Sequence, residues 1–354
     1  MILAAYVTGH GFGHFVRSSA VLSRLPGVRI HLRTNDRALT LADRATWAAS
    51  ISEVDVGPGV IPRGPLDSDL PATRAALSRH IENWPRLLER EVAYLRDSGA
   101  RLVFGDVPPI AFAAAAAAGI PSIAMTNFSW SWIYDGFAAV DPWFSEAANI
   151  LREAETRATL LLELEMGGGL EHFPRRRRIL PVARQLLRSR EAIVAALGLS
   201  ENRSFVLFSL GGFGTDQTIL LRGESRHALV VTSARLLASP NTRLIEPSAD
   251  FPHHELVAAA ACVIGKPGYG TVSECMLRPT PMCFLRRDNF REGPLLADGI
   301  QRYLPSAPIT LEELADGRWV EVVEKAIASI PPQPTPKPEG APQAASILLE
   351  MLQT

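Results

Sequence analysis

The stretch Ile264–Glu274 carries residue types and spacing that suit the binding of an anion. It follows the apolar run Ala258–Val263 and leads into a predicted helix, so it forms a glycine-bearing turn between a strand and a helix. Such a turn presents unpaired backbone N–H groups, and Gly268 and Gly270 have no side chains to hold an anion at a distance. The pattern indicates a phosphate or diphosphate site.

Glu274 lies about one turn into that predicted helix. Its carboxylate can accept hydrogen bonds from a diol such as a ribose while the phosphates lie at the turn. The turn and the carboxylate together therefore predict a nucleotide site. The alternative is a tight connection in an α/β domain, with a carboxylate that the helix dipole favours at the start of a helix.

Two other stretches repeat the order of strand, glycine turn and helix. The apolar run Ile2–Thr8 precedes the turn Gly9–His14, and Phe205–Leu210 precedes Gly211–Thr215. These two turns open the two halves of the chain, whereas the turn at Gly265 closes the second half. The repetition favours functional turns over simple connections.

Length and composition predict two globular domains. The chain has 354 residues, of which 47% are hydrophobic and 21% charged. Since a domain usually has about 150 residues, two domains are expected. The formal net charge of −1 argues against a nucleic acid as the main partner, which usually requires a basic face.

The cysteines and the apolar runs predict the cellular compartment. Cys262, Cys275 and Cys283 lack a CxxC spacing and are interpreted as reduced, buried thiols. The N-terminal apolar run is too short for a signal peptide, and no run approaches the roughly 20 apolar residues of a membrane span. The sequence predicts a cytoplasmic protein without integral membrane association, and its oligomeric state stays open.

Predicted strands and helices alternate along the first half. Helices are expected over Phe15–Leu25, near Asp36–Trp47, and over Ala72–Leu95 with a kink at Pro85. The alternation predicts a parallel sheet with helices on both faces, and ligands then gather at the carboxyl ends of the strands. Four groups of polar residues follow predicted strands and are expected to meet in one crevice: His10, His14, Asp106 and Thr126–Ser129.

Three further stretches each allow two interpretations. Asn127–Tyr134 is rich in aromatic residues, either as a helix that packs Trp130 and Tyr134 into the core or as a platform for a sugar or ring. Arg175–Arg178 is either a solvated face of a linker or a contact for an anion. The cluster Arg286–Glu292 follows a predicted strand, either as a surface loop with paired charges or as a sugar-binding segment.

The chain is expected to divide as follows. A first Rossmann-like domain covers 1–166, and a linker that contains Gly167–Gly169 covers 167–188. A second Rossmann-like domain covers 189–330. A proline-rich extended tether covers 331–343, and 344–354 forms a short helix that crosses back to the first domain.

Two doubly wound halves with glycine turns at their strand ends describe the GT-B arrangement of sugar transferases. The chain resembles the glycosyltransferase-like N-terminal region of plant arabinokinases and its free-standing bacterial relatives. More distantly, its glycine turns are similar to those of UDP-glycosyltransferases and of the lipid-linked N-acetylglucosaminyltransferase of peptidoglycan synthesis. The segments that carry the resemblance are Tyr6–His14, Gly105–Pro109, Thr126–Trp130, Gly265–Glu274 and Phe284–Pro294.

The resemblance implies an α/β protein of the GT-B fold, with two Rossmann-like doubly wound domains that face each other across a cleft. It implies an inverting, metal-independent glycosyltransferase that moves a sugar from a nucleotide sugar, such as a UDP-sugar, to a hydroxyl or amine of a small-molecule or saccharide acceptor. A sugar-kinase domain is not expected after residue 354, so the resemblance does not imply arabinose phosphorylation.

The resemblance also assigns roles to residues. His14 is the expected base, Asp106 the carboxylate that orients it, and His10 the rival base. Glu274 is expected to hold the donor ribose, and Lys266 to neutralise the leaving diphosphate. The diphosphate group comprises Gly11, Gly13, Gly211, Gly212, Lys266, Gly268, Tyr269, Gly270 and Thr271; the sugar group Arg287, Asp288, Asn289 and Glu292; and the acceptor group His10, Asn127, Ser129 and Trp130.

No metal or cofactor is expected besides the nucleotide sugar, which is a co-substrate. The one Asp-any-Asp pattern, Asp67-Ser68-Asp69, is interpreted as a chance occurrence. Two alternative functions remain open. One is a catalytically silent module that binds a nucleotide sugar, and the other is a sugar-nucleotide epimerase of the same fold.

Overall fold

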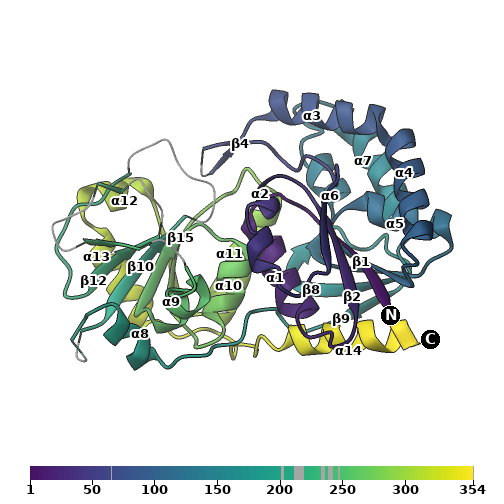
Figure 1. Ribbon diagram of the computed structural model, residues 1–354. Helices are drawn as coiled ribbons and strands as arrows, with labels where there is room; N and C mark the ends of the chain where they lie inside the picture. The colour runs from purple at the N-terminus through teal and green to yellow at the C-terminus, as the bar shows by residue number, and fades with distance from the viewer. Residues whose placement is uncertain are drawn as a thin grey trace. The chain divides into compact units, whose positions relative to one another are not determined.

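A computed structural model describes residues 1–64, 66–200, 203–210, 219–232, 236–237, 242–245 and 248–353 (Figure 1). The chain divides into two compact units. The first comprises Met1–Ile61, Ser68–Val182 and the segment that starts at Glu339, and the second comprises Pro62–Asp67 and Ala183–Pro338. Each unit contains one large sheet.

The sheet of the first unit has seven strands, and every pair of neighbours is parallel. β1 lies between β2 and β6, so the strand order reverses at β1 and β6. The strands, from one edge to the other, are β3 (Ser50–Glu53), β2 (Arg29–Thr34), β1 (Ile2–Val7), β6 (Leu102–Asp106), β7 (Ser122–Phe128), β8 (Leu160–Gly168) and β9 (Arg176–Arg178).

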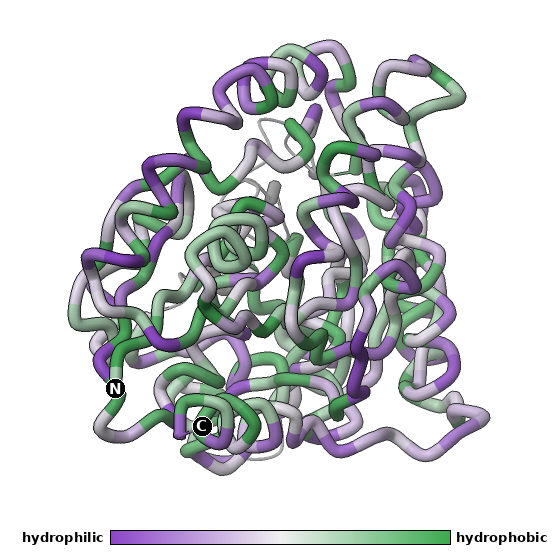
Figure 2. The backbone as a smooth tube through the Cα atoms, turned by 90° about the vertical axis from the view of Figure 1, so that its right-hand side faces the viewer, coloured by the Kyte–Doolittle hydropathy of each residue, from purple (hydrophilic) through white to green (hydrophobic). Residues whose placement is uncertain are grey.

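Helices cover both faces of this sheet (Figure 1). α4 and α5 pack on the face that carries Ala4, Tyr6 and Val103, whereas α1 contacts α14 on the other. In Figure 2 hydrophilic and hydrophobic residues alternate along the outer helices. The helices are α1 (Phe12–Leu22), α2 (Asp36–Leu39), a 3₁₀ turn (Ala42–Arg44), α3 (Leu70–Glu82), α4 (Trp84–Asp97), α5 (Pro109–Ala118), α6 (Trp130–Asp135), α7 (Trp143–Glu155) and α14 (Gly340–Gln353).

The sheet of the second unit has six strands, again all parallel. Its order reverses between β10 and β15. The strands are β14 (Thr242–Leu244), β12 (Ala228–Val231), β10 (Phe205–Ser209), β15 (Cys262–Gly265), β16 (Met282–Leu285) and β17 (Ser306–Ile309); the helices are α8 (Arg190–Ala196), α9 (His253–Ala259), α10 (Tyr269–Cys275), α11 (Glu292–Tyr303), α12 (Leu311–Asp316) and α13 (Trp319–Ala328). β11 (Ile219–Leu220) and β13 (Leu236–Leu237) form a separate small sheet.

The predicted parallel α/β architecture is confirmed, but several boundaries differ. The first helix begins at Phe12, so Gly13 and His14 are helical rather than part of the preceding turn. The helix expected over Ala72–Leu95 is two helices, α3 and α4, which meet at Asn83. Pro85 lies in the first turn of α4, where its missing N–H costs no intrahelical hydrogen bond.

The segment expected to be a linker is divided between the units. Gly167 lies in β8, and a Cβ there would lie 1.5 Å from the backbone oxygen of Asn127, so close approach of two backbones requires this glycine. The arginine run supplies β9, an edge strand of the first sheet, and Arg176 and Arg178 pair with Glu163 on β8. Charged side chains protect an edge strand from pairing with other chains.

The tip of a hairpin in the first half of the sequence belongs to the second unit. β4 (Pro62–Arg63) and β5 (Asp67–Ser68) form the hairpin, and its tip, Pro62–Asp67, belongs to the second unit. Leu66 packs against the hydrophobic core beside α12 and α13. Nothing in the spacing of residues predicted this contact.

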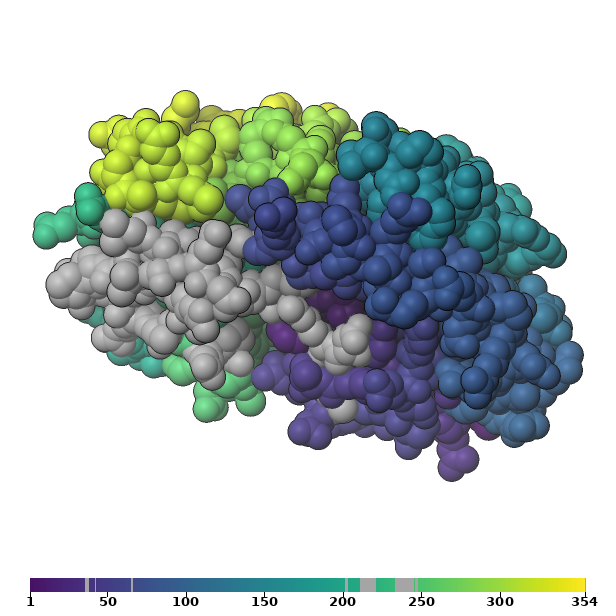
Figure 3. Space-filling model, turned by 90° about the horizontal axis from the view of Figure 1, so that it is seen from above, coloured from purple at the N-terminus to yellow at the C-terminus, as the bar shows by residue number. Residues whose placement is uncertain are grey.

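α3 and α4 lie at the surface of the first unit, as the space-filling view shows in blue (Figure 3). Their outward positions are exposed, for example Arg86 and Glu89. Over the described ranges, every helix is too short or too polar to span a bilayer.

Candidate functional site

The first candidate site lies where the strand order of the first sheet reverses. His14 is in the first turn of α1, which follows β1, and Asp106 is the last residue of β6. β1 and β6 are neighbours, with Val7 opposite Asp106. In open α/β sheets, ligands bind outside the carboxyl ends of the strands at such a reversal. The topology therefore brings together two residues that are 92 positions apart.

Asp106 is the centre of a buried cluster that we call the first triplet: His14, Asp106 and Arg17. Nδ1 of His14 lies 2.9 Å from Oδ1 of Asp106. Arg17 donates from Nε to Oδ2 at 2.8 Å and from Nη2 to Oδ1 at 2.5 Å. Ser18 also donates to Oδ2, at 2.8 Å. The carboxylate, which is fully buried, thus accepts from three side chains.

The charge of Asp106 is stabilised within this cluster. Burial alone would raise the pKa of Asp106, but the charge of Arg17, the nearby His14 and the hydrogen bonds from both lower it well below its ordinary value. Nδ1 of His14 lies 2.9 Å from Oδ1 of Asp106 and 2.9 Å from Nη2 of Arg17, which can only donate. In the tautomer that carries its proton on Nδ1, that proton is donated to Asp106 and Nε2 is the basic nitrogen. Among the described residues, no hydrogen bond is found to Nε2.

The backbone next to Asp106 is strained. Val107 has φ of 80°, which is rare for a β-branched residue. Across the sheet, the pairing of β7 with β8 shifts register between Thr126 and Phe128, and Asn127 lies in that irregularity. Such features are found near sites where a side chain must be aimed.

The predicted acceptor residues lie around the first triplet, but most of them are buried. Asn127 accepts from Nη1 of Arg17 at 2.8 Å and is fully buried. Ser129 caps α6, accepting from the backbone of Trp132 at 3.2 Å and donating to the carbonyl of Gly169 at 2.8 Å. Both side chains thus have protein partners, and their predicted contact with the acceptor stays a prediction.

Trp130 is a core residue, contrary to the expectation of an acceptor platform. Only 2% of it is exposed. It stacks on Tyr134 at 5.6 Å and meets Phe128 and His10 edge to face, each at 5.2 Å between ring centroids. Of the two interpretations of this aromatic segment, the packing one describes the structure. His10 is the partly exposed member of the group.

Gly11 and Gly13 lie next to the two histidines, and only at Gly11 does the backbone conformation favour a glycine. Gly11 caps α1 with φ of 80°, a conformation that glycine adopts without cost. Gly13 lies within α1, and a Cβ there would meet no atom within 4 Å. Space alone therefore does not explain Gly13.

The second candidate site lies where the strand order of the second sheet reverses. Ser209 ends β10 and Gly265 ends β15, and these residues lie opposite each other. A Cβ on Gly265 would lie 2.2 Å from the carbonyl oxygen of Ser209, so the strands meet closely there. Lys266 follows, Gly268 caps α10, and Tyr269, Gly270 and Thr271 form its first turn, whereas Gly211 and Gly212 lie outside the described residues.

Glu274 is the centre of a second cluster, which we call the second triplet: His253, Glu274 and Arg184. Arg184 donates from Nη2 to Oε1 at 2.7 Å, and Nδ1 of His253 lies 2.8 Å from Oε2. Nε2 of His253 lies 3.0 Å from the hydroxyl of Ser209. Burial raises the pKa of Glu274, but the charge of Arg184 and the hydrogen bond from His253 outweigh it and lower the pKa to about 2.

The predicted sugar-binding cluster has partners within the second unit. Arg287 donates to the carbonyl of Leu66 at 3.2 Å, and Asn289 donates to Asp67 at 2.5 Å. Asp288 pairs with Arg286 at 3.0 Å. Glu292 is the first residue of α11. The hairpin tip therefore occupies two of these side chains.

The two aspartates of the Asp-any-Asp pattern make separate contacts. Asp67 accepts from Asn289, whereas Asp69 caps α3 by accepting from the backbone of Ala72 at 2.9 Å. Neither contact points to a metal. The expectation that no metal is required stays a prediction.

Reading the sequence missed five side chains that are hydrogen-bonded within the two clusters: Arg17, Ser18, Arg184, Ser209 and His253. One pattern was available, since Arg17 is three positions after His14, and such spacing places both on one helical face. Arg184 is 90 positions from Glu274, so only the fold brings them together.

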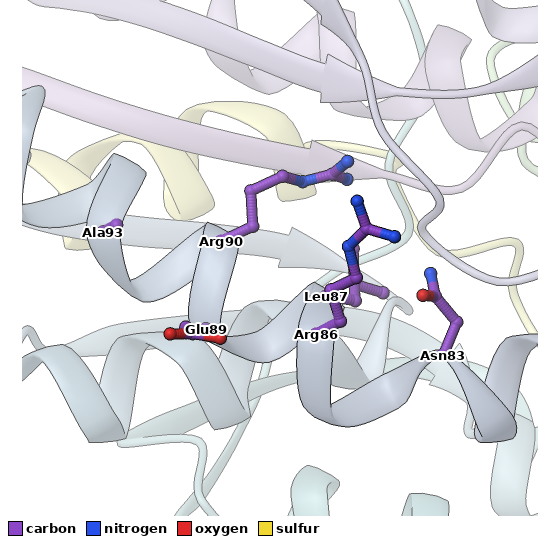
Figure 4. Close-up of a pocket in the computed structure, with 6 residues that line it drawn as sticks. All are labelled: Asn83, Arg86, Leu87, Glu89, Arg90 and Ala93. Carbon is purple, nitrogen blue, oxygen red and sulfur yellow. The ribbon is translucent and has the colours of Figure 1, made fainter.

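A surface hollow lies along α4, and Figure 4 shows its lining. Arg86 and Arg90 project from one helix there, and both are exposed. Because one helix lines this hollow and its polar groups are solvated, it lacks the buried polar groups of the two triplets. The lining residues are Asn83, Arg86, Leu87, Glu89, Arg90 and Ala93.

Comparison with known structures defines the fold. The chain is similar to the spinosyn forosaminyltransferase, with a TM-score of 0.63, 15% identity, and coverage of 100% of this chain and 95% of that one. It is similar to a glycosyltransferase of Arabidopsis thaliana complexed with UDP-L-rhamnose, with a TM-score of 0.58, 16% identity and coverage of 99% of both chains. The predicted GT-B fold is confirmed.

One sequence relative is more specific. The chain is 31% identical over 347 residues to an L-arabinokinase from Arabidopsis thaliana, a match that covers 94% of this chain and 32% of the relative. The chain thus spans about a third of the length of that relative. The predicted resemblance to arabinokinases is confirmed. No family model matches the chain.

Proposed function

We propose that this protein is a glycosyltransferase that moves a sugar from a nucleoside diphosphate sugar to a hydroxyl or amine of a small-molecule or saccharide acceptor. The observation that carries the proposal is the first triplet, in which a buried carboxylate holds Nδ1 of His14 at 2.9 Å. The GT-B fold supports it, as does the neighbour complexed with UDP-L-rhamnose.

His14 is the proposed base. Nε2 takes the proton from the acceptor hydroxyl as its oxygen attacks the anomeric carbon of the donor sugar. The bond between that carbon and the diphosphate oxygen breaks, and the nucleoside diphosphate leaves with the electron pair. A single displacement of this kind inverts the anomeric centre. Asp106 fixes the tautomer of His14 and stabilises the imidazolium that forms.

The turn Lys266–Thr271 is the proposed site of the diphosphate. The ammonium of Lys266 offsets the negative charge that develops on the leaving group. We propose that the reaction uses no metal and no cofactor, so that chelation by EDTA leaves the rate unchanged.

The test uses the full chain with UDP-, dTDP- and GDP-sugars. Calorimetric titration measures binding of the donor, and NMR and mass spectrometry identify products with and without a panel of acceptors. The proposal expects a new glycosidic bond of inverted configuration. If no nucleotide sugar binds, the proposal is wrong.

The principal alternative is a silent module that binds a nucleotide sugar without turnover. One observation favours it: Arg287, Asn289 and Glu274 already have protein partners, so a bound sugar must share them or displace them. The same assay separates the two functions, because a silent module binds the donor yet hydrolyses and transfers nothing. An epimerase would convert the donor without any acceptor.

A further inference from the structure

We infer that Arg17 is a positioning residue for the proposed base, because it holds Asp106 in the orientation that His14 requires. The inference rests on the proposed function, since it concerns the base of that reaction. It deepens that function by giving a buried ion-pair partner a role in turnover besides its role in stability. Arg17 acts through Asp106 and is not proposed to touch either substrate.

Arg17 joins one helix to the carboxyl ends of two strands. It lies in α1 and donates to Asp106, the last residue of β6, through Nε at 2.8 Å and Nη2 at 2.5 Å. Its third nitrogen, Nη1, donates to the side-chain oxygen of Asn127 in the neighbouring strand β7 at 2.8 Å. Only 3% of the Arg17 side chain is exposed. Protein groups, rather than water, therefore fix the guanidinium.

The contact through two nitrogens fixes the plane of the carboxylate. A guanidinium is a rigid planar fork, and two parallel N–H groups prevent the carboxylate of Asp106 from rotating. Ser18 adds a third donor, to Oδ2 at 2.8 Å. Oδ1 is thereby held 2.9 Å from Nδ1 of His14. The direction in which Asp106 meets the imidazole is therefore set mainly by Arg17.

The same contact bears on the tautomer of His14. Nη2 of Arg17 can only donate, and it lies 2.5 Å from Oδ1 of Asp106 and 2.9 Å from Nδ1 of His14. A hydrogen bond to a charged acceptor is about twice as strong as one between neutral groups. Nη2 therefore donates to the carboxylate in preference to the imidazole, and Nδ1–H of His14 donates to the same oxygen. In neutral His14 the proton is thus on Nδ1, and Nε2 is the base.

A lysine cannot take over this role. An ammonium is a point charge on a flexible stem, so it keeps the charge of the cluster but does not fix the plane of Asp106. It also lacks the further arm that reaches Asn127. The substitution Arg17→Lys therefore separates the charge of Arg17 from its geometry.

A second buried arginine in the same unit provides a matched control. Arg33 in β2 donates to Glu91 in α4 through Nε at 2.6 Å and Nη2 at 2.8 Å, again with two nitrogens. Their side chains are 8% and 0% exposed. Tyr6 also donates to Glu91, at 3.0 Å, and no histidine is among the described hydrogen-bond partners of this carboxylate. Arg33→Lys thus makes the same chemical change away from His14.

The first test compares the steady-state kinetics of the full chain with those of Arg17→Lys and Arg33→Lys. Arg17→Lys is expected to lower kcat by about 10²-fold, the effect of moving a catalytic group by about 1 Å, and to leave the KM of the donor unchanged. Arg33→Lys is expected to lose similar stability in urea denaturation but to keep the kcat of the unaltered protein. Equal kcat values in the two variants, at a temperature at which both are folded, would overturn the inference.

The second test observes the imidazole without any substrate. Long-range proton–nitrogen NMR spectra of histidine-labelled protein report which ring nitrogen carries the proton, and His14→Gln identifies the signals of His14. In alkaline solution the unaltered protein and Arg33→Lys are expected to carry the proton on Nδ1, whereas Arg17→Lys is expected to show both tautomers. A proton on Nε2 in the unaltered protein, or an unchanged spectrum in Arg17→Lys, would contradict the inference.

Asn127→Ala keeps the test decisive if Arg17→Lys fails to fold. This variant removes only the partner of Nη1 and is expected to lower kcat a few-fold with an unchanged KM of the donor; an unchanged kcat would count against the inference. If the unaltered protein transfers no sugar, the proposed function is wrong, and the NMR comparison still decides whether Arg17 positions His14. Normal transfer by Arg17→Lys would defeat the inference and leave the transferase intact.

Discussion

Each unit contains a cluster of one carboxylate, one histidine and one arginine. Asp106 is the last residue of a strand, whereas Glu274 lies in the helix α10. Each cluster has a buried carboxylate that accepts from Nδ1 of a histidine and from an arginine, near the reversal of the strand order. A serine is also bonded into each cluster. Similar chemistry has thus been assembled from unrelated sequence positions.

The difference lies in where the serine is bonded. In the first triplet Ser18 donates to the carboxylate, and no described residue is hydrogen-bonded to Nε2 of His14. In the second, Ser209 is bonded to Nε2 of His253, so that both ring nitrogens have partners. A histidine with one engaged nitrogen suits proton transfer, whereas one engaged at both suits the positioning of neighbours.

The largest expected effect is a difference between the two histidines in how their removal changes the transfer rate. His14→Ala should lower the transfer rate by about 10²- to 10⁴-fold, the usual contribution of a general base, and leave nucleotide affinity unchanged. His253→Ala should weaken nucleotide binding with little change in the rate at saturating donor. Steady-state kinetics and titration of both variants measure the contrast. Equal losses of rate in the two variants would contradict it.

The next effect concerns the arginines. Arg17 is 3% exposed, so Arg17→Leu leaves Asp106 as a buried charge without its cation and should cost about 3–5 kcal/mol of unfolding free energy. Arg184 is 28% exposed, and Arg184→Ala should cost less. Urea denaturation measures both. The double variant Arg17→Leu/Asp106→Leu should recover part of the loss, and no recovery would refute the pairing.

Acidification tests both carboxylates together. Their pKa values are lower in the folded protein than in the unfolded chain, so the unfolded chain binds more protons in acid and stability falls as pH falls. For Glu274 the loss should begin near its ordinary pKa and continue to about 2. Thermal unfolding across this range should decline less steeply in Glu274→Gln. Parallel curves would count against the assignment.

The smallest effects concern the serines. Ser18→Ala removes one donor from a buried carboxylate and should cost about 1–3 kcal/mol of stability. Ser209→Ala leaves the carboxylate contacts in place and should change stability by less than that. The same denaturation experiment compares the two. A larger loss for Ser209→Ala would reverse the proposed roles.

The fold was largely predictable because buried parallel strands and glycine turns leave a clear pattern. The strands that end at Asp106 and Ser209 are continuous apolar runs, and residues at their ends could be expected to meet. The pattern could not show which residues would meet. Trp130 is an example, since it is buried in the core. An aromatic residue near a site gives the same sequence pattern whether its side chain contacts a ligand or packs in the core.

The partners of the two carboxylates were not predictable from spacing. Arg184 lies in a segment without regular secondary structure, and His253 opens α9, so neither follows a strand of the large sheet directly. The hairpin tip was missed for a related reason: Leu66 and Asp67 reach residues more than 200 positions away, and a loop rich in glycine and proline carries no periodicity. The position of Asp106 could be predicted from the sequence, since Asp106 is the last residue of its own strand.

The hairpin tip has a practical consequence for anyone who wishes to produce the units separately. The chain passes between the units at four junctions, after Ile61, Asp67, Val182 and Pro338. A gene fragment that encodes 183–338 would lack Leu66, and the hydrophobic surface on which that leucine packs would lie open to water. Neither unit is encoded by one continuous stretch of the gene, so no single cut in the gene yields both units intact.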